Sequence, residues 1–325
     1  MDTRSALLRL LSDGRFHSGA RLGAALGIGR SAVWKHVRAL GRGDLEIHAV
    51  PGRGYRLAAP LELLDEARIL EHLPSSSRRR LAGLEVLGET DSTNRRLLAR
   101  AACCAAPHAC LAEYQHAGRG RLGRRWVTPY GRAICLSLLW RFGAPPPVLG
   151  CLGLAAGVAV IRALRSLGLT EGGLKWPNDI VWRQAKLGGI LVEAAAENHG
   201  ACHAVIGVGI NVNMPPDAGR SVSQPWTDLE SALGHRPSRN EGAALIIHHL
   251  MEVMAAFEAE GFSALAREWR SHDALRDRWV EVRQGDRTSH GIARGIDDQG
   301  ALCVEGDDGM RRFLSGDVSL RATKP

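Results

Sequence analysis

Two basic segments rich in glycine constrain this chain more than any other feature of its sequence. Residues 118–126 read Gly-Arg-Gly-Arg-Leu-Gly-Arg-Arg-Trp, and residues 175–180 read Lys-Trp-Pro-Asn-Asp-Ile. Glycine lets backbone amides approach a bound oxyanion, and the planar guanidinium of arginine matches the oxygens of carboxylates and phosphates. The segments indicate loops that hold anions, although either one alone is more typical of a solvated turn or a nucleic-acid contact.

The composition is that of a globular protein of two or three domains. The chain has 325 residues, of which 45% are hydrophobic and 23% charged, which excludes the disordered and fibrous classes. Its net charge of +8 is unevenly distributed, because residues 1–60 carry ten Arg and Lys against four Asp and Glu, a net charge of +6. Such a concentration of positive charge is expected in a part of the chain that meets a polyanion.

Cysteine usage and apolar runs predict a cytoplasmic protein. The seven cysteines are an odd number without a C-x-x-C pair, which argues against a disulfide framework and against a zinc site. We therefore expect reduced thiols and no metal ligands among the side chains. Residues 2–9 have no signal-peptide pattern, and the longest apolar run, near residues 151–161, is too short to span a bilayer. No association with a membrane is expected.

Residues 1–62 are expected to form a winged helix-turn-helix domain. A short amphipathic helix is followed by a second helix that starts at Ser18 and ends at residues 27–29, and a third helix follows at once. Two strand-like runs, residues 47–50 and 55–57, then flank a Pro-Gly-Arg-Gly turn. This pattern predicts a hairpin, the wing, next to the helices.

The third helix has the pattern of a recognition helix. Its apolar positions share one face, so the polar side chains of the other face are free to enter a DNA major groove. The expected DNA contacts are these polar side chains and the arginine at the tip of the wing: Arg30, Ser31, Lys35, Arg38 and Arg53. Trp34 could pack under the wing or contact DNA. The alternative for the whole segment is a three-helix packing domain with a solvated basic face.

Four segments in a fixed order resemble the catalytic domain of the biotin protein ligases. The two basic segments are followed by Lys-Leu-Gly-Gly-Ile-Leu-Val-Glu at residues 186–193 and by Gly-Val-Gly-Ile-Asn-Val-Asn at residues 207–213. Together with the N-terminal domain, the resemblance covers essentially the whole chain and points to the bifunctional members, which also repress the biotin operon. It implies an α+β protein with a central mixed α/β domain of the biotin/lipoate ligase type over residues 63–272.

Residues 273–325 are expected to form a small SH3-like β-barrel. Short strand-like runs from residue 279 onward alternate with turns rich in Gly and Asp, a spacing typical of small all-β domains. In the family this domain lies beside the active site and helps to bind ATP and the acceptor protein.

The resemblance implies a reaction in two steps. Biotin and ATP give biotinyl-5′-AMP and pyrophosphate, and a lysine of the biotin carboxyl carrier protein of acetyl-CoA carboxylase then attacks the adenylate. Two anions approach each other in the first step, so positioned cations and Mg²⁺ are expected to neutralise them. The adenylate would also act as a corepressor that promotes a homodimer and its binding to operator DNA of biotin synthesis genes.

The resemblance also assigns roles to individual residues. The residues expected to bind biotin are Ser92, Thr93, Asn94, Gln115, Arg119, Gly120, Arg121 and Lys186. The residues expected to bind ATP are Arg121, Arg124, Trp126, Lys175, Asn178, Asp179, Asn211 and Trp226. The expected catalytic residues are Lys186, Arg121, Lys175 and Asp179, the last as a candidate base for the acceptor lysine. From the residues alone, Asp91 or Ser92 could simply cap a helix, and Trp126 could be a core anchor.

Two other functions stay open on the sequence. A lipoate or octanoate transferase has a related catalytic fold, and a ligand-responsive transcription regulator could have lost ligase activity. The basic loop, the Lys-Trp-Pro-Asn-Asp segment and the attached winged helix favour biotin over lipoate. The presence of four cations favours an enzyme over a regulator without catalysis: Arg119, Arg121, Lys175 and Lys186.

Overall fold

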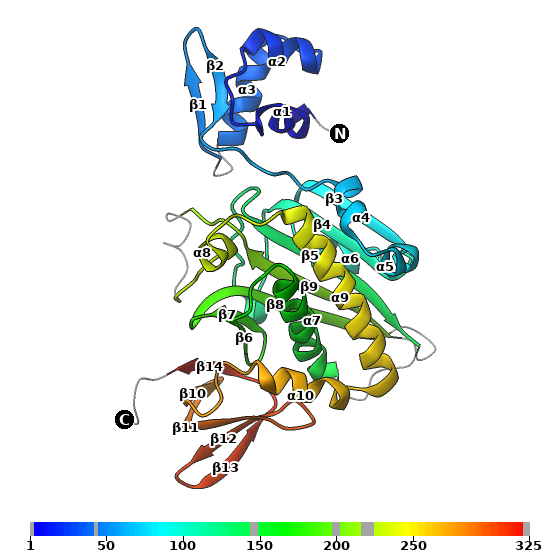
Figure 1. Cartoon of the computed structure of the whole chain (residues 1–325), viewed down its shortest axis with the longest axis vertical. Helices are drawn as coiled ribbons and strands as arrows, with labels where there is room; N and C mark the ends of the chain where they lie inside the picture. The colour runs from blue at the N-terminus through cyan, green and yellow to red at the C-terminus, as the bar shows by residue number, and fades with distance from the viewer. Residues whose placement is uncertain (1–2, 42–44, 144–148, 197–201, 216–223, 321–325) are drawn as a thin grey trace.

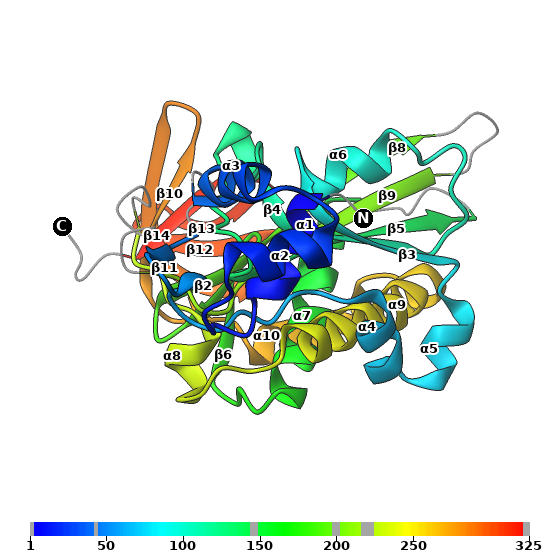
Figure 2. The same cartoon turned by 90° about the horizontal axis from the view of Figure 1, so that it is seen from above.

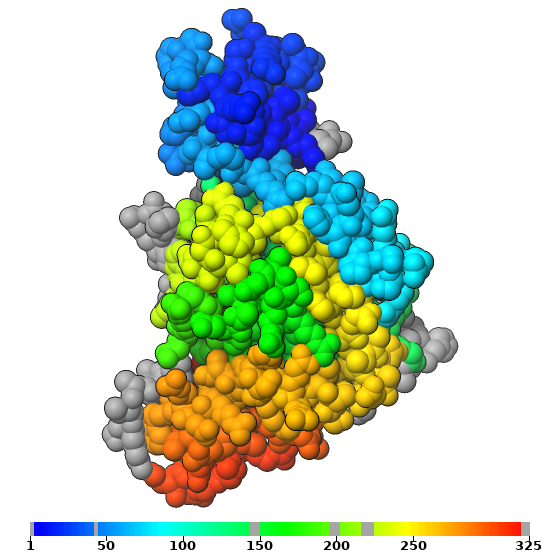
Figure 3. All heavy atoms as spheres, viewed as in Figure 1, coloured from blue at the N-terminus to red at the C-terminus, as the bar shows by residue number. Residues whose placement is uncertain are grey.

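The protein has three parts stacked along its longest axis (Figure 1). A computed structural model describes residues 3–41, 45–143, 149–196, 202–215 and 224–320. The N-terminal winged helix lies at one end, a large sheet with its helices lies in the middle, and a smaller all-β part lies at the other end (Figures 1 and 3).

The N-terminal part is the predicted winged helix-turn-helix. Ser18 caps the second helix by accepting a hydrogen bond from the amide of Arg21, and Gly27 ends that helix with a φ of 66°. Apolar side chains of the three helices and of the second strand form one buried cluster. The elements are α1 (Thr3–Leu11), α2 (Gly19–Leu26), α3 (Arg30–Gly41), β1 (Ile47–Val50) and β2 (Gly54–Leu57).

A seven-stranded sheet forms the centre of the molecule. Its strand order is β3-β4-β5-β9-β8-β7-β6, and the strands are antiparallel except for the pair β3 and β4. The strands are β3 (Gly83–Thr90), β4 (His108–Gln115), β5 (Ala133–Phe142), β6 (Gly172–Lys175), β7 (Asp179–Trp182), β8 (Ala185–Ala196) and β9 (Cys202–Asn211).

Two long helices cover one face of this sheet and leave much of the other face open (Figure 2). The first, α7 (Leu152–Ser166), packs along the second, α9 (Arg239–Glu260), and both contribute to the main apolar core. The remaining helices are α4 (Glu66–His72), α5 (Ser75–Arg80), α6 (Thr93–Leu98), α8 (Leu229–Leu233) and α10 (Ser263–Ser271), with 3-10 turns η1 (Arg121–Gly123) and η2 (Leu149–Cys151).

Helix α9 is long and apolar enough to cross a membrane by length and composition alone. It is longer than the apolar run near residues 151–161, which is too short to span a bilayer. However, 56% of its most apolar stretch is buried inside the protein, where it packs against α7, α4 and β5. Its apolarity is therefore explained by its place in the core.

Small residues line the open face of the sheet. In the strand register, Cys135 lies opposite Gly209, which lies opposite Gly189. Two residues further along β5, on the same face, Ser137 lies opposite Gly207. Cross-strand partners share a face. The middle of this face therefore carries three glycines, the thiol of Cys135 and the hydroxyl of Ser137, whereas larger side chains would fill the space above the sheet. This leaves room for a cavity.

The C-terminal part is an antiparallel five-stranded sheet in the order β13-β12-β11-β10-β14. Its strands follow the predicted runs closely: β10 (Trp279–Gln284), β11 (Arg287–Ile296), β12 (Leu302–Gly306), β13 (Gly309–Phe313) and β14 (Asp317–Leu320). Strands β13 and β14 form its two edges, so the ladder is open within the described residues. The buried Trp176 joins it to the central part, since its indole N–H donates to the carbonyl of Gly300.

A buried polar network fixes the connection between the winged helix and the central sheet. Arg239 forms an ion pair of 2.7 Å with Glu113, and the two side chains are only 3% and 5% exposed. Arg239 also donates to the carbonyl of Glu62, and Asn240 donates to the carbonyl of Leu63. The connecting segment is thus bonded to α9 and, through Glu113, to β4. The domain boundaries at residues 62 and 272 stay predictions.

Helix α1 also contacts the central sheet directly. Arg4 donates to Glu89 at 3.3 Å, and His116 lies 3.1 Å from the same carboxylate. A Cβ atom on Gly88 would lie 2.7 Å from the hydroxyl of Ser5, so this glycine allows α1 to approach β3. Glu89 and His116 are neighbours, along the chain, of the Asp-Ser-Thr-Asn turn and the basic loop. The winged helix therefore rests on strand ends that also carry predicted site residues.

Candidate functional site

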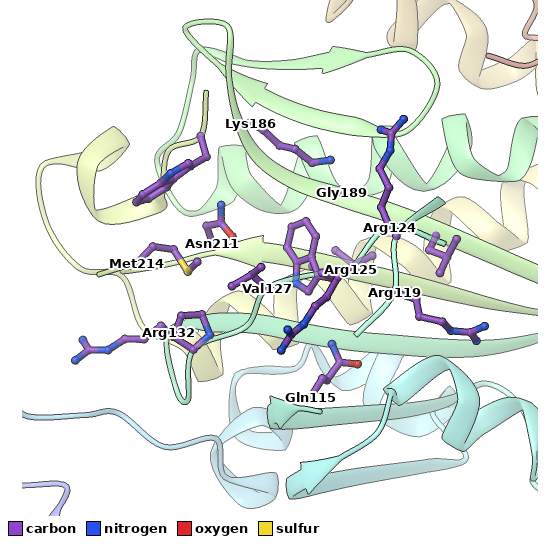
Figure 4. A pocket seen from close by; sticks show the side chains of 18 of the residues that line it. Gln115, Arg119, Arg124, Arg125, Val127, Arg132, Lys186, Gly189, Asn211 and Met214 are labelled. Atoms are coloured by element: carbon purple, nitrogen blue, oxygen red, sulfur yellow. The ribbon is translucent and has the colours of Figure 1, made fainter. Parts of the chain in front are cut away.

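A cavity of about 910 Å³ lies on the open face of the central sheet. It is lined by every residue predicted to bind biotin or ATP, and Figure 4 shows Gln115, Arg119, Arg124, Lys186 and Asn211 among them. Ala58 and Ala59 of the connecting segment and Asp317 of the C-terminal part also line it. Residues from three parts of the chain thus meet around one space, which is large enough for a small organic ligand with a nucleotide.

A polar cluster forms one end of the cavity. The side-chain oxygen of Gln115 accepts hydrogen bonds from the backbone amide of Thr93, at 2.9 Å, and from the Thr93 hydroxyl. The hydroxyl of Ser137 contacts the Thr93 hydroxyl and the Asn94 carbonyl oxygen, at 2.7 and 2.6 Å. Ser92 caps α6 by accepting from Arg95. Donors and acceptors are therefore held in fixed positions at the end of a buried space.

Asn94 reaches the cavity because residue 207 is a glycine. A Cβ atom at Gly207 would lie 2.3 Å from the Asn94 side-chain oxygen. Ser137 belongs to this cluster but was missed on the sequence. Its signal was a polar residue within the apolar run at the centre of strand β5, at the position that faces Gly207.

The basic loop, residues 118–126, folds into a short hairpin at the cavity mouth. The amide of Trp126 donates to the carbonyl of Gly118, and the amide of Gly120 donates to the carbonyl of Arg124. At its tip, Leu122 has a φ of 55° and is 75% exposed. This left-handed conformation is unfavourable for a branched side chain. The loop thus combines internal hydrogen bonds with local strain.

Trp126 forms a wall of the cavity. Its ring stands over Gly209, where a Cβ atom would lie 2.6 Å from the indole. The ammonium nitrogen of Lys186 lies 5.8 Å from the ring centroid. The indole N–H is buried and has no hydrogen-bond partner within the described residues. The ring therefore borders the predicted ligand space instead of anchoring the core under the helices.

Three of the five predicted cavity cations form ion pairs with carboxylates. Lys186 lies 2.6 Å from Asp179, and Arg119 lies 3.0 Å from Glu193. Arg124 reaches Asp317 of the C-terminal part. Arg119 consequently points along the sheet, and Arg124 points toward the C-terminal part (Figure 4). The carboxylate of Asp179 is likewise engaged.

Arg121 and Lys175 are the two predicted cations without an ion pair within the described residues. Burial lowers the pKa of the Lys175 ammonium, and the nearby charge of Lys186 acts in the same direction while Asp179 opposes it. Burial also lowers the pKa of Arg121. A half-buried cation that lacks a fixed anion favours an anionic ligand, because such a ligand replaces the solvation lost on burial.

Asn178 and Asn211, which are both predicted to bind ATP, use their side chains to hold the backbone around the cavity. The amide of Asn178 donates to the carbonyl of Ile190, and that of Asn211 donates to the carbonyl of Thr227, both at 2.9 Å. The segment 225–227 pairs with Lys186 through backbone hydrogen bonds, which brings Trp226 to the cavity rim. Asn178 and Asn211 thus shape the walls from which Lys186 and Trp226 project.

Two arginines and an aspartate of the cavity wall were missed on the sequence. Arg125 and Arg132 both line the cavity (Figure 4). The pKa of Arg132 is lowered by burial and by the charge of Arg236. Asp317 joins the wall from the last described strand. Arg125 lies in the basic loop that the sequence already indicates. Arg132 and Asp317 had no such signal and meet the site only through the tertiary fold.

The predicted DNA contacts are all exposed on the winged helix. Val33, Val37 and Leu40 of α3 are buried, whereas its polar face is exposed. The wing tip adds Arg53, whose guanidinium carbon lies 4.2 Å from the centre of the Phe16 ring. Phe16 was missed on the sequence. The exposed residues of the predicted surface are Arg30, Ser31, Lys35, Arg38 and Arg53.

Comparisons with known proteins agree along the chain. Residues 3–56 match the helix-turn-helix domain family, residues 87–211 match the biotin/lipoate A/B protein ligase family, and residues 277–321 match the C-terminal domain of biotin protein ligases. The bifunctional ligase/repressor BirA of Salmonella typhimurium is 40% identical over 98% of this chain and 97% of its own length. The Escherichia coli protein of the same name is 39% identical over the same shares.

A solved structure extends the comparison to the fold. The biotin protein ligase of Aquifex aeolicus in complex with biotin and ATP superimposes with a TM-score of 0.63 at 27% identity. The match covers 74% of this chain and 99% of that protein. With three family matches in order and 40% identity over nearly its full length, the chain belongs to the family of bifunctional biotin protein ligase/repressors.

Proposed function

We propose that this protein is an ATP-dependent ligase that activates biotin to biotinyl-5′-AMP and transfers it to a lysine of the biotin carboxyl carrier protein of acetyl-CoA carboxylase. The single observation that carries the proposal is the cavity, which gathers the polar cluster around Thr93 and the half-buried cations Arg121 and Lys175 on one face of the sheet. The polar cluster suits the ureido ring of biotin, and the cations suit its carboxylate and the α-phosphate of ATP.

In the first step, a carboxylate oxygen of biotin attacks the α-phosphorus, and the bond to the bridging oxygen of pyrophosphate breaks. Arg121 and Lys175 reduce the repulsion between the two anions because they are desolvated cations without their own carboxylate within the described residues. Lys186 is proposed to turn from Asp179 toward the reacting oxygens as charge develops. Arg124 and Arg119 are proposed to exchange their present carboxylate partners for ligand oxygens.

Mg²⁺ is proposed as a cofactor that arrives with ATP. Magnesium neutralises phosphate charge and commonly keeps several water ligands alongside one or two carboxylates. The cavity offers Asp179 and Asp317, and each is paired with a cation. Within the described parts of the chain no group of three or more His, Cys, Asp or Glu side chains is placed to hold a metal. The residues present thus fit an ion held mainly by phosphate oxygens.

In the second step, the acceptor lysine attacks the acyl carbon of the adenylate and AMP leaves. A lysine with a pKa near ~10.4 is mostly protonated at cytoplasmic pH, so a base must accept its proton. Asp179 is the proposed base, and it becomes available when Lys186 moves to the adenylate. Because Lys186 and Asp179 form an ion pair of 2.6 Å, formation of the adenylate would free the Asp179 carboxylate to accept the proton of the acceptor lysine.

One assay separates this function from its alternatives. With radiolabelled pyrophosphate, the ligase is expected to catalyse pyrophosphate–ATP exchange that depends on biotin. Exchange that depends on lipoate or octanoate instead would support a ligase for those acids, and the absence of exchange with any of the three acids would contradict the ligase function. The assay reports the first step alone and needs no acceptor protein.

The winged helix is proposed to make the same protein a repressor of biotin synthesis genes in the cytoplasm. One recognition helix reads one half-site, so a homodimer on a palindrome is proposed as the binding species, with biotinyl-5′-AMP as corepressor. We expect biotin plus ATP to raise affinity for biotin-operon promoter DNA and to raise the sedimentation coefficient of the protein. Promoter affinity that is the same with and without both ligands would contradict the corepressor role.

The wing is proposed to contact a phosphate through Arg53. Arg53→Ala should weaken DNA binding and reduce the slope of log affinity against log salt by about one, because one phosphate contact is lost. Anisotropy titrations between low and moderate salt measure the slope. Arg79→Ala serves as a control, since Arg79 is also an exposed arginine but lies on α5, away from the winged helix. Equal slopes for wild type and Arg53→Ala would rule the contact out.

A further inference from the structure

An exposed indole lies in the middle of the basic face of α3. Trp34 is 47% exposed, while the buried side of this helix is completed by Val33, Val37 and Leu40. Packing of the domain therefore does not account for a tryptophan at this position. Large exposed aromatic side chains on a small domain are characteristic of binding surfaces, where their burial provides much of the affinity.

Packing under the wing was one of the two roles open on the sequence, but the ring contact of Trp34 in the described residues is with its own helix. Its ring is stacked against Arg38 on the next turn of the same helix, with the guanidinium carbon 4.8 Å from the ring centroid. The wing arginines Arg53 and Arg56 stack instead on Phe16. The indole and the Arg38 guanidinium thus form one unit on the outer surface of α3, held together by a cation–π contact.

The charge around this unit identifies the kind of partner. Residues 30–41 contain no acidic residue, and the exposed cations Arg30 and Lys35 flank Trp34 along the helix. The domain as a whole carries most of the excess positive charge of the chain. An apolar ring surrounded by cations complements a surface that is anionic at its edges and carries apolar groups at its centre. Duplex DNA presents such a surface in the major groove, where thymine methyl groups lie between two phosphate backbones.

We propose that Trp34 reads thymine by contact with its 5-methyl group in the major groove, and that the stacked Arg38 is thereby held in position to donate to the neighbouring base or phosphate. The inference rests on the proposed DNA-binding function and adds a specificity-determining residue to it. Trp34 supplies an apolar contact that hydrogen-bonding side chains of α3 cannot supply. Arg38 loses fewer conformations on binding because the ring already restricts its guanidinium.

The expected loss of DNA affinity follows from the size of the methyl group that Trp34 is proposed to contact. A methyl group transferred from water to an apolar contact contributes about 0.8 kcal/mol, which corresponds to about fourfold in affinity. Replacing that thymine with uracil removes the methyl group and leaves base pairing unchanged. Wild-type protein should therefore bind about fourfold more weakly when uracil replaces the thymine that Trp34 contacts. In a symmetric site, replacement in both half-sites should multiply the effect.

The experiment uses the full chain with biotin and ATP present. Duplexes that bind tightly are first selected from a random library, and each thymine of the selected site is then replaced by uracil in turn. Wild type should show the loss at one or more thymines, whereas Trp34→Ala should bind more weakly and show no loss at the same positions. Lys35→Ala is the matched control, because it removes a neighbouring cation of α3 and should weaken binding while it keeps the thymine preference.

Three outcomes decide the proposal. Retention of the full thymine preference by Trp34→Ala would overturn it, even if binding were weaker. Absence of any thymine-to-uracil effect in wild type would overturn it while leaving the DNA-binding function intact. A wild-type protein that selects no duplex would overturn the DNA-binding function and this inference together. Pyrophosphate exchange with biotin should be equal in all the variants, which shows that Trp34→Ala and Lys35→Ala retain the catalytic fold.

Discussion

Replacement of Lys186 by alanine should slow the formation of biotinyl-5′-AMP by about a hundredfold or more. Removal of one positioned group that stabilises developing charge typically lowers a rate by 10²–10³. The same change should affect the binding of biotin and ATP much less, because the cation is proposed to meet the reacting oxygens mainly as charge develops. Single-turnover adenylate formation measures the rate, and a rate within about threefold of wild type would contradict the assignment.

Because Lys186 pairs with Asp179, a second variant is needed to interpret the rate of Lys186→Ala. Lys186→Ala leaves the Asp179 carboxylate unpaired in an anion-binding cavity, where it would repel the substrates. The double variant Lys186→Ala/Asp179→Asn removes this extra charge, and we expect it to recover only a small part of the lost rate. Full recovery would show that the loss came from the unpaired carboxylate. Arg183→Ala is the control, because Arg183 is an exposed cation on the adjacent turn.

Replacement of Arg239 by methionine should destabilise the protein by about 3–5 kcal/mol. Removing one partner of a buried ion pair leaves the other charge uncompensated, and such changes fall in this range. Arg239 additionally donates to the carbonyls of Ala133 and Glu62, which lose these bonds as well. The free energy of unfolding, from urea titrations followed by tryptophan fluorescence, measures the effect.

Two further variants separate the buried charge from other causes. Arg239→Met/Glu113→Gln removes both charges and should be more stable than Arg239→Met alone, because no carboxylate is left buried without a partner. Arg236→Met, a change to a partly exposed neighbour whose ion pair is with Glu230, should alter stability by less than about 1 kcal/mol. A loss for Arg239→Met no larger than for Arg236→Met would refute the structural role of the buried pair.

The parts of the fold that depend on local sequence were predicted well. Ser18 and Gly27 mark the ends of α2 because capping needs only the side chain or the conformational freedom of one residue. The strands of the C-terminal part were predicted because turn residues separate them at short, regular intervals. The family resemblance placed residues from distant segments in one site, and the cavity brings them together. Their individual roles stay predictions.

The parts that depend on tertiary register were not predicted. Arg119 pairs with Glu193 because β8 runs past the basic loop, and sequence spacing gives no measure of that distance. Arg132 and Asp317 reach the cavity from a turn and from the last described strand. Ser137 joins the polar cluster because the register places it opposite Gly207. Each of these contacts depends on which strands are neighbours in the sheet, and local patterns do not specify that order.

The bonds that join the winged helix to the central sheet have a consequence for the DNA that a dimer accepts. The connecting segment is held by Arg239 and Asn240, and α1 is held by the contact between Arg4 and Glu89. In the proposed dimer the two recognition helices would then keep a fixed separation and a fixed angle. One base pair added between half-sites rotates them by about one tenth of a helical turn. Spacer length, as well as base sequence, would therefore determine which promoters the protein occupies.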